Sequence, residues 1–171
     1  MTEEKKLTGY PSTDKPWDRK GTKLRIPNTS FYDFFMKKSR INASKILSRC
    51  RDNILDMPML RNESYRYAKA FYSIGIRKGD IVPICLPPCN EGIVLFFALN
   101  RIGAVSTFLS TSLEKVELLQ YQARYNAKVL ILGEHHDSSL QISVVLPNKP
   151  YVKTLHDLVS LGDNEKTVFE K

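Results

Sequence analysis

The sequence predicts an α/β fold in which a mostly parallel sheet is flanked by helices and preceded by a short N-terminal hairpin. Two observations lead to this prediction. Strand-length apolar runs alternate with helical patterns in the order β-α-β-α-β. The runs are also apolar throughout, as expected for strands that helices cover on both faces. The 171 residues are enough for one domain with a buried core, and the crossovers between its parallel strands should be right-handed.

Three regions are expected along the chain. Residues 1–28 hold glycines and prolines among charged side chains, which predicts an extended N-terminal arm that Tyr10 and Trp17 could anchor to the domain. Residues 29–161 carry the α/β pattern. Residues 162–171 are polar and lack a cap or a closing element, which is typical of a linker or of a truncated end.

The first helix is predicted from Ser30, because Ser30 followed by Asp33 forms a capping pattern. One face of this helix carries Phe31, Phe34, Phe35 and the stem of Lys38. We interpret this aromatic face as part of the core and not as a binding site.

A short hairpin and a longer helix should follow. The apolar segments Ile46 to Cys50 and Ile54-Leu55 flank Arg51-Asp52-Asn53, a pattern that predicts two strands joined by a turn. Asp56 and Pro58 then begin the helix, since a proline in the first turn gives up an N–H that would have no partner there. The apolar side of the helix consists of Leu60, Tyr67, Ala68, Phe71 and Ile74, and Gly75 is its expected end.

The second half of the chain should contain three strands, at residues 81–86, 104–109 and 128–132. Pro83 removes a hydrogen bond of the ladder, so the first of these strands is expected at an edge of the sheet or at a bulge.

Two helices should connect these strands. We expect Asn90 to cap the first helix, whose body covers residues 93–102 and ends at Gly103. Thr111 with Glu114 forms the capping pattern of the second. This second helix passes through Val116, Leu119 and Ala123 and ends near Asn126. Weaker patterns predict a further strand at 141–146 and a short amphipathic helix at 154–161.

Ligands of open parallel sheets bind beyond the carboxyl ends of the strands. Here those ends are Pro87-Pro88-Cys89-Asn90, Ser110-Thr111-Ser112 and Glu134-His135-His136. One interpretation is a small-molecule or phosphate site, in which helix N–H groups at Asn90 and Thr111 face an anion and the two histidines contact a phosphate. The other interpretation, which we favour, is that these residues only cap helices or lie in a solvated loop.

No catalytic residue is predicted, and the cofactor-binding residues stay unknown, because the known motifs are missing. The sequence has neither Gly-x-Gly-x-x-Gly nor Gly-x-x-x-x-Gly-Lys-Ser/Thr, and no Gly-x-Ser-x-Gly elbow follows a strand. Gly75-Ile-Arg-Lys-Gly79 precedes a strand instead of following one. We therefore interpret its glycines as a helix stop and a tight turn.

The three cysteines, Cys50, Cys85 and Cys89, are an odd and sparse set, which favours reduced thiols over a disulfide framework. Cys89 beside a helix N-terminus could be a nucleophile with a lowered pKa. Small apolar fillers at a strand end explain Cys85 and Cys89 more simply. The cysteines and the histidines at 135, 136 and 156 do not have the spacing of a zinc clip, so no metal site is expected.

The formal charge is +8 and the pI is about 9.4, which leaves nucleic acid, an acidic protein or an anionic membrane surface open as partners. The densest basic groups are Lys15 to Lys23, Lys37-Lys38-Arg40 and the Arg49/Arg51 pair. Because these groups are spread along the chain without interleaved aromatic residues, we favour a solvated surface and expect no nucleic-acid partner.

Membrane insertion and secretion are not expected. The longest apolar stretch, Gly92 to Leu99, is far shorter than the ~20 residues of a transmembrane helix. The polar start Met-Thr-Glu-Glu-Lys-Lys lacks the apolar core of a signal peptide. The sequence therefore predicts no transmembrane segment and a cytoplasmic location.

Five segments carry a resemblance to a known family. They are Arg66-Tyr-Ala-Lys-Ala-Phe, Gly75-Ile-Arg-Lys-Gly-Asp-Ile-Val, Leu86-Pro-Pro-Cys-Asn-Glu, Phe97-Ala-Leu-Asn-Arg-Ile-Gly-Ala-Val and Ala127-Lys-Val-Leu-Ile-Leu. In order and spacing, from about Ser30 to Glu134, they resemble the N-terminal part of the adenylate-forming (AMP-binding) superfamily. That superfamily includes acyl-CoA synthetases, adenylation domains of peptide synthetases, and luciferases. The arm, with Leu7-Thr-Gly-Tyr-Pro-Ser and then Lys15-Pro-Trp, is similar to the start of some bacterial acyl-CoA ligases.

The resemblance implies an N-terminal fragment of an ATP-dependent acyl-CoA synthetase. In that reaction a carboxylate attacks the α-phosphate of ATP to give an acyl adenylate, and the thiol of coenzyme A then displaces AMP. The phosphate loop, the groups around adenine, ribose and magnesium, and the lysine of the C-terminal domain match no position here. The resemblance therefore implies a scaffold that is inactive alone. Its partner would be the remainder of the enzyme, and ATP, Mg and coenzyme A would bind only to the full-length protein.

Some positions depart from the family pattern. Ser110-Thr-Ser stands where Asn-Pro is common, the segment from His135 to Gln141 lacks arginines that approach coenzyme A in acetyl-CoA synthetase relatives, and the hairpin lacks the usual aromatic residue and glycine. A subdomain without its remainder would also expose core, so a homodimer is a further expectation. Two other classes stay open: a stand-alone basic α/β binding module and a small flavodoxin-like nucleotide domain.

Overall fold

A computed structural model describes residues 27–39, 45–136, 139–146 and 152–163. In chain order, the helices and strands of these ranges are α1 (Phe31–Lys38), β1 (Ile46–Cys50), β2 (Asn53–Asp56), α2 (Met57–Ser73), β3 (Ile81–Cys85), α3 (Asn90–Arg101), β4 (Val105–Phe108), α4 (Lys115–Arg124), β5 (Leu130–His136), β6 (Ser139–Val145), β7 (Val152–Thr154) and α5 (Leu155–Asp163). Tyr10, Trp17 and most of the predicted linker lie outside the described residues, so the division into three regions stays a prediction.

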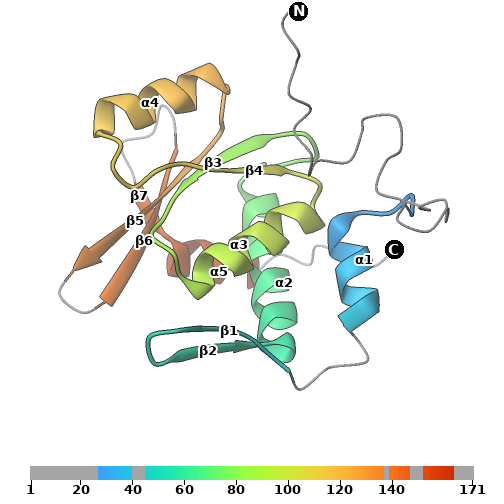
Figure 1. The fold of residues 1–171 in the computed structure, drawn as a ribbon. Helices are drawn as coiled ribbons and strands as arrows, with labels where there is room; N and C mark the ends of the chain where they lie inside the picture. The colour runs from blue at the N-terminus through green and yellow to red at the C-terminus, as the bar shows by residue number, and fades with distance from the viewer. Residues whose placement is uncertain (1–26, 40–44, 137–138, 147–151, 164–171) are drawn as a thin grey trace, which may run out of the picture.

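The larger sheet has the strand order β4-β3-β5-β6-β7 (Figure 1). Strand β3 pairs in parallel with β4 and with β5, and β6 and β7 extend the sheet in antiparallel fashion. Strands β1 and β2 form a separate antiparallel hairpin. The predicted α/β fold class is therefore confirmed. The weaker predictions for residues 141–146 and 154–161 are also confirmed, because they correspond to β6 and α5.

The sequence suggested that Pro83 marks an edge of the sheet. This is wrong, because β3 lies between two parallel strands. The N–H of Leu109, just after β4, donates to the carbonyl oxygen of Ile84 over 2.8 Å, so Ile84 directs its backbone groups toward β4. Backbone groups alternate in direction along a strand, and Pro83 therefore faces β5. The pairing of β3 with β5 begins only at Ile84. The hydrogen bonds between β3 and β5 thus begin after Pro83, so the sheet does not require the N–H that proline lacks.

The two faces of the larger sheet are covered unequally. Helices α2, α3 and α5 pack on one face (Figure 1), where the largest buried cluster joins these helices to β3, β5 and β6. On the other face, α4 contributes Leu118 to a small cluster with Cys85 and Leu130. Among the described residues, large apolar side chains that stay exposed include Val105 and Phe108 on β4 and Val116 and Leu119 on α4. One face is therefore closed, while the edge strand and α4 still present apolar surface.

The caps at Ser30 and Asp56 are confirmed. The hydroxyl oxygen of Ser30 accepts a hydrogen bond from the N–H of Asp33 at 3.0 Å, and a carboxylate oxygen of Asp56 accepts one from the N–H of Met59 at 2.8 Å. The predicted hairpin is also present, although its turn is shorter than expected because β2 already begins at Asn53. Local capping chemistry thus sets where α1 and α2 begin.

The aromatic face of α1 is only partly buried. Phe35 packs against the core cluster as predicted, with its ring centroid 4.7 Å from that of Phe97. Phe31 and Phe34 are 49% and 41% exposed, whereas Tyr32 and Met36 are buried. A tertiary contact explains the difference: the N–H of Tyr32 donates to the side-chain oxygen of Asn100 in α3 at 2.8 Å. This hydrogen bond holds the Tyr32 side of α1 against α3. The prediction that Phe31 and Phe34 belong to the core is therefore wrong.

The turn between α2 and β3 has the structure expected for its glycines. Gly75 ends α2 with a φ of +93°, and Gly79 forms a tight turn with a φ of +88°. Asp80 then fixes the turn: one of its carboxylate oxygens accepts hydrogen bonds from the N–H of Arg77 and from Nζ of Lys128, both at 2.7 Å. Lys128 also donates to the carbonyl oxygen of Gly75 at 3.2 Å. The end of α2 and the starts of β3 and β5 are joined at this point.

Replacing Asp80 by Asn should lower the free energy of unfolding by about 1 kcal/mol at pH 7. The loss is small because Lys128 is exposed, so its ion pair with Asp80 adds little to the stability that the hydrogen bonds provide. Partial desolvation alone would raise the pKa of Asp80, but the hydrogen bonds from Lys128 and Arg77 outweigh it and hold the pKa below its usual value. The stabilisation is therefore present above the ordinary carboxyl pKa of about 4 and is lost as the pH falls through the lower folded-state pKa.

Urea unfolding at pH 7 and at pH 3 measures this effect. The difference between the native protein and Asp80→Asn should shrink at the lower pH. Asp52→Asn, in the exposed hairpin turn, is the control and should change stability little at either pH. An Asp80→Asn variant as stable as the native protein at pH 7 would contradict the role assigned to this carboxylate.

Candidate functional site

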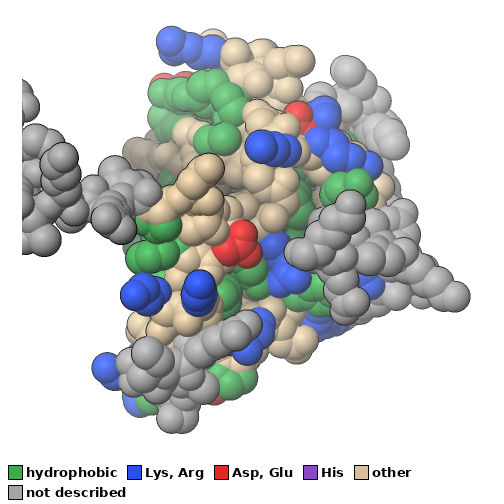
Figure 2. All heavy atoms as spheres, turned by 90° about the vertical axis from the view of Figure 1, so that its right-hand side faces the viewer, with side chains coloured by type: hydrophobic (Ala, Val, Ile, Leu, Met, Phe, Trp, Pro, Cys, Tyr) green, Lys and Arg blue, Asp and Glu red, His purple; other side chains and the backbone are tan. Residues whose placement is uncertain are grey.

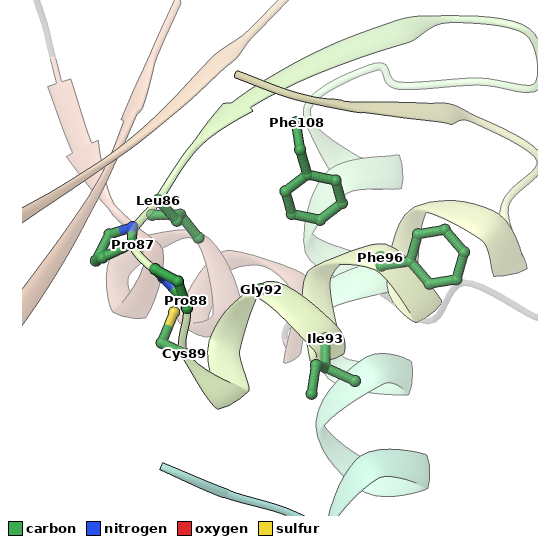
Figure 3. A pocket seen from close by; sticks show the side chains of 8 residues that line it. All are labelled: Leu86, Pro87, Pro88, Cys89, Gly92, Ile93, Phe96 and Phe108. Atoms are coloured by element: carbon green, nitrogen blue, oxygen red, sulfur yellow. The ribbon is translucent and has the colours of Figure 1, made fainter. Parts of the chain in front are cut away.

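An apolar cleft of about 400 Å³ lies at the carboxyl end of β3 (Figure 3). Its walls come from the loop after β3, the beginning of α3 and the end of β4. The lining residues are Leu86, Pro87, Pro88, Cys89, Gly92, Ile93, Phe96 and Phe108. Figure 3 shows the ring of Phe108 pointing from β4 toward α3. The cleft thus occupies the crevice where open parallel sheets bind ligands.

Gly92 sets the space between α3 and Phe108. A Cβ at this position would lie 3.7 Å from the Phe108 ring, an ordinary contact, so a longer side chain would extend into the cleft. None of the lining side chains carries a charge, and the Cys89 sulfur is their only heteroatom. This lining fits an apolar group. It does not fit a triphosphate or a magnesium ion, which need charged or oxygen-bearing partners.

After β3, the predicted helix cap at Asn90 is wrong. Cys89, not Asn90, is the N-cap residue of α3, and no side chain caps the helix. Asn90 is buried and its Nδ2 donates to the carbonyl oxygen of Asn53 at 3.0 Å. Its Oδ1 has no hydrogen-bond partner among the described residues. The side chain of Asn90 joins α3 to the hairpin, which is why it does not cap its own helix.

The second strand end also differs from the prediction. Helix α4 begins at Lys115, and Glu114 with Glu117 forms its capping box. The predicted pattern of Thr111 with Glu114 is therefore wrong. Thr111 lies in a turn before the helix, so its N–H does not begin a helix that could face an anion.

The third strand end lies further along the chain than expected. Glu134, His135 and His136 belong to β5, because β6 pairs with β5 as far as the pair His136 and Ser139. The prediction that these residues follow the strand is wrong. Their side chains are outside the described residues, so a phosphate contact by the histidines stays untested.

A second hollow of about 460 Å³ lies between α4 and the sheet. Its lining combines apolar and polar residues: Cys85, Thr111, Leu113, Lys115, Leu118, Leu132, Gly133, Ser143 and Val145. Lys115 is the only charged residue in this lining. One lysine and the hydroxyls of Thr111 and Ser143, with no second cationic side chain in the lining, do not make a site for a triphosphate.

Burial favours the protonated form of two of the thiols, Cys85 and Cys89. Burial raises the pKa of Cys85. Burial, with a smaller effect of the Glu91 carboxylate, raises the pKa of Cys89 to about 11. The Gly92 N–H at the helix N-terminus lowers the pKa of Cys89, but burial outweighs this effect, which favours the interpretation as apolar filler.

Metal binding and membrane insertion have no candidates within the described ranges. No three His, Cys, Asp or Glu side chains gather there closely enough to hold a metal ion. No helix in the same ranges combines the length and apolar character needed to cross a membrane.

The described fold has a counterpart among solved structures. The N-terminal subdomain of Klebsiella oxytoca NpsA matches with a TM-score of 0.61 and 18% sequence identity, over 80% of this chain and 34% of that one. This likeness concerns the fold alone. It defines the class of the molecule as an α/β fold like that of the NpsA N-terminal subdomain.

The family itself is shown by sequence. The model of the AMP-binding enzyme family matches residues 52–170, which is more than half of the chain. The chain belongs to this family, and the resemblance noted from its five segments is confirmed.

Two curated relatives show how much of a family member the chain covers. It is 35% identical over 80 residues to 2-succinylbenzoate–CoA ligase of Oceanobacillus iheyensis, covering 47% of this chain and 17% of that protein. It is 34% identical over 84 residues to acetyl-coenzyme A synthetase of Vibrio cholerae, covering 49% of this chain and 13% of that protein. The matched part thus spans less than a fifth of either relative.

The apolar cleft was not predicted from the sequence. The sequence places Pro87-Pro88 at a strand end, where a small-molecule or phosphate site is one interpretation and helix capping the favoured one, but it does not predict an apolar lining. The signal that could have found the cleft is Gly92 in the first turn of a helix otherwise rich in large apolar residues. A glycine there leaves room beside the helix. Phe108 comes from a different strand, and its approach to Gly92 is not visible in a local pattern.

At pH 7.5, Cys89 should react with iodoacetamide about 100-fold more slowly than a cysteine in an unstructured peptide, because the raised pKa leaves about a hundredth as much thiolate. The rate should rise about tenfold per pH unit up to pH 9. Mass spectrometry of a Cys50→Ser, Cys85→Ser variant follows Cys89 alone. A rate at pH 7.5 equal to that of the peptide would show that the thiol is not held in its protonated form.

Proposed function

We propose that this chain is the N-terminal part of an ATP-dependent acyl-CoA ligase, in which it acts as a structural scaffold and does not catalyse by itself. The observation that carries the proposal is the family match over residues 52–170 together with coverage of less than a fifth of the curated relatives. Both of those relatives are named as enzymes that handle coenzyme A.

The remainder of the enzyme is the proposed partner. Exposed apolar side chains on β4 and α4, including Val105 and Leu119, offer surface that a further domain could bury. On its own, the chain could bury the same side chains against a second copy, so a homodimer is an alternative form. The proposed location is the cytoplasm.

The apolar cleft is the proposed contribution of this part to the substrate site. Its lining from Leu86 to Phe108 holds no charged group, and it suits the hydrocarbon of an acyl group. ATP, magnesium and coenzyme A would be held by other parts of the enzyme, because the cleft offers no partner for a phosphate or a divalent cation. The chain alone would then bind none of these cofactors.

The alternative of a stand-alone basic binding module receives less support. On the face shown in Figure 2, Lys and Arg side chains are separated by hydrophobic and neutral ones and do not form one continuous stripe. Binding to phosphates depends steeply on salt. A titration with nucleic acid at two salt concentrations separates the two proposals, and tight, salt-sensitive binding would favour the module. A flavodoxin-like nucleotide domain would instead show thermal stabilisation by a nucleotide or flavin.

The isolated chain should catalyse no ATP–pyrophosphate exchange with acetate, benzoate or decanoate, because its sequence lacks the known phosphate-loop motifs. A longer polypeptide, in which the chain is followed by the nucleotide-binding remainder of a family member, should catalyse the exchange with at least one carboxylate. Radiolabelled pyrophosphate measures both. Exchange by the pure isolated chain would refute the scaffold role, and its absence from every longer polypeptide would refute the ligase assignment.

In such an active polypeptide, Gly92→Leu should raise the KM for the carboxylate about tenfold and leave the KM for ATP unchanged. The leucine would occupy the cleft that the acyl group is proposed to use, at a cost of about 1–2 kcal/mol of binding. Val116→Leu, on the exposed side of α4, is the matched control and should change neither KM. Equal effects of Gly92→Leu on both KM values would point to a general distortion instead of a lost acyl site.

A further inference from the structure

Two thiols lie where the hairpin meets the beginning of α3. Cys50 ends β1, and its Sγ–H donates to the carbonyl oxygen of Pro88 at 3.5 Å. The carbonyl carbon of Pro88 is bonded to the nitrogen of Cys89. From standard bond lengths, the sulfur of Cys50 therefore lies within about 6 Å of the Cα atom of Cys89. The negative charge of a Cys50 thiolate would raise the pKa of Cys89, and this effect is smaller than those of burial and of Glu91.

A second polar contact holds the two segments together. Nδ2 of Asn90, the residue after Cys89, donates to the carbonyl oxygen of Asn53 at 3.0 Å. Asn53 is the residue that pairs with Cys50 across the hairpin. Two hydrogen bonds thus join the hairpin to the beginning of α3, one at each sequence neighbour of Cys89.

The third cysteine has a different environment. Cys85 is buried in β3, and its Sγ–H donates to the carbonyl oxygen of Ser110 at 3.4 Å. Cys50 and Cys89 are only half-buried. A small reagent can therefore reach the pair more easily than it can reach Cys85.

We propose that Cys50 and Cys89 form a reversible disulfide, which ties the β1–β2 hairpin to the N-terminus of α3, when the protein meets a small-molecule disulfide such as oxidised glutathione. Disulfides need Cα atoms about 4.4–6.8 Å apart. The hydrogen bond from Cys50 to Pro88 brings the Cys50 sulfur close to the backbone of Cys89, so a small movement of the hairpin toward α3 would close the bond. The proposal rests on this chain's own contacts and holds whether or not the chain serves a ligase.

The exchange proceeds in two steps. The Cys50 thiolate attacks one sulfur of oxidised glutathione, forms a mixed disulfide and releases one glutathione thiolate. Cys89 then gives its proton to solvent and attacks the Cys50 sulfur, which forms the Cys50–Cys89 bond and releases the second glutathione. Two electrons pass from the two protein thiols to the oxidant. Cys89 is the later nucleophile because it is held protonated at neutral pH.

The disulfide would act at the cleft. Cys89 lines it, and the hairpin would become covalently fixed beside it. Reduction would return the contact to the Cys50 hydrogen bond and the Asn90 amide. The hairpin's position would then depend on the thiol–disulfide state of its surroundings.

The test is disulfide mapping of the unmodified 171-residue chain. The protein is incubated at pH 8 with oxidised and reduced glutathione in a ratio of about ten to one, free thiols are then blocked with N-ethylmaleimide, and tryptic peptides are identified by mass spectrometry. We expect a peptide pair linked through Cys50 and Cys89, with Cys85 carrying the maleimide. Excess dithiothreitol should remove the link.

The variants give matched controls. Cys85→Ser should form the link as the native chain does, whereas Cys50→Ser and Cys89→Ser should lose it. A glutathione adduct that persists on Cys50 while Cys89 is alkylated would overturn the proposal. So would a dominant link to Cys85 or between two chains. The map of the native chain decides the matter even if one variant folds poorly.

Discussion

The burial of β3 on both faces is the constraint on which the rest of the structure depends. A strand between two parallel neighbours is covered by crossover helices above and below. Val82 and Ile84 are fully buried in the cluster formed with α2, α3 and α5, and Cys85 is buried on the side of α4. The point where β3 leaves the sheet then fixes Pro87-Pro88 and the first turn of α3. The cleft and the thiol pair lie where they do because β3 ends there.

The sequence could predict those parts of the fold whose signals are local. Ser30 and Asp56 cap their own helices through N–H groups three residues away, and Gly75 ends α2 because its backbone adopts a positive φ. Short windows of sequence also predict the alternation of strands and helices. These elements could be found without any tertiary knowledge.

The failed predictions share a different cause. An asparagine can cap a helix or bond to a distant backbone with similar energy, and for Asn90 the choice depends on Asn53, which lies 37 residues away. Phe31 has the apolar pattern of a core residue but stays half exposed, whereas Tyr32, whose N–H donates to Asn100 68 residues away, is buried. The cleft needs Gly92 and Phe108 from separate elements. In each case the local sequence permits more than one arrangement of the residue, and a tertiary contact decides which one forms.

The chemistry of the strand ends explains why a scaffold role suits this part of the proposed enzyme. Activating a carboxylate with ATP requires groups that stabilise developing charge. At the end of β3 the described lining offers carbon surface and one protonated thiol. Such a wall can exclude water from a reacting group and can select an acyl chain by its shape. It cannot neutralise a phosphate. Recognition of the apolar group and handling of the phosphates would therefore reside in different parts of the polypeptide, which is consistent with a chain that covers less than a fifth of its relatives.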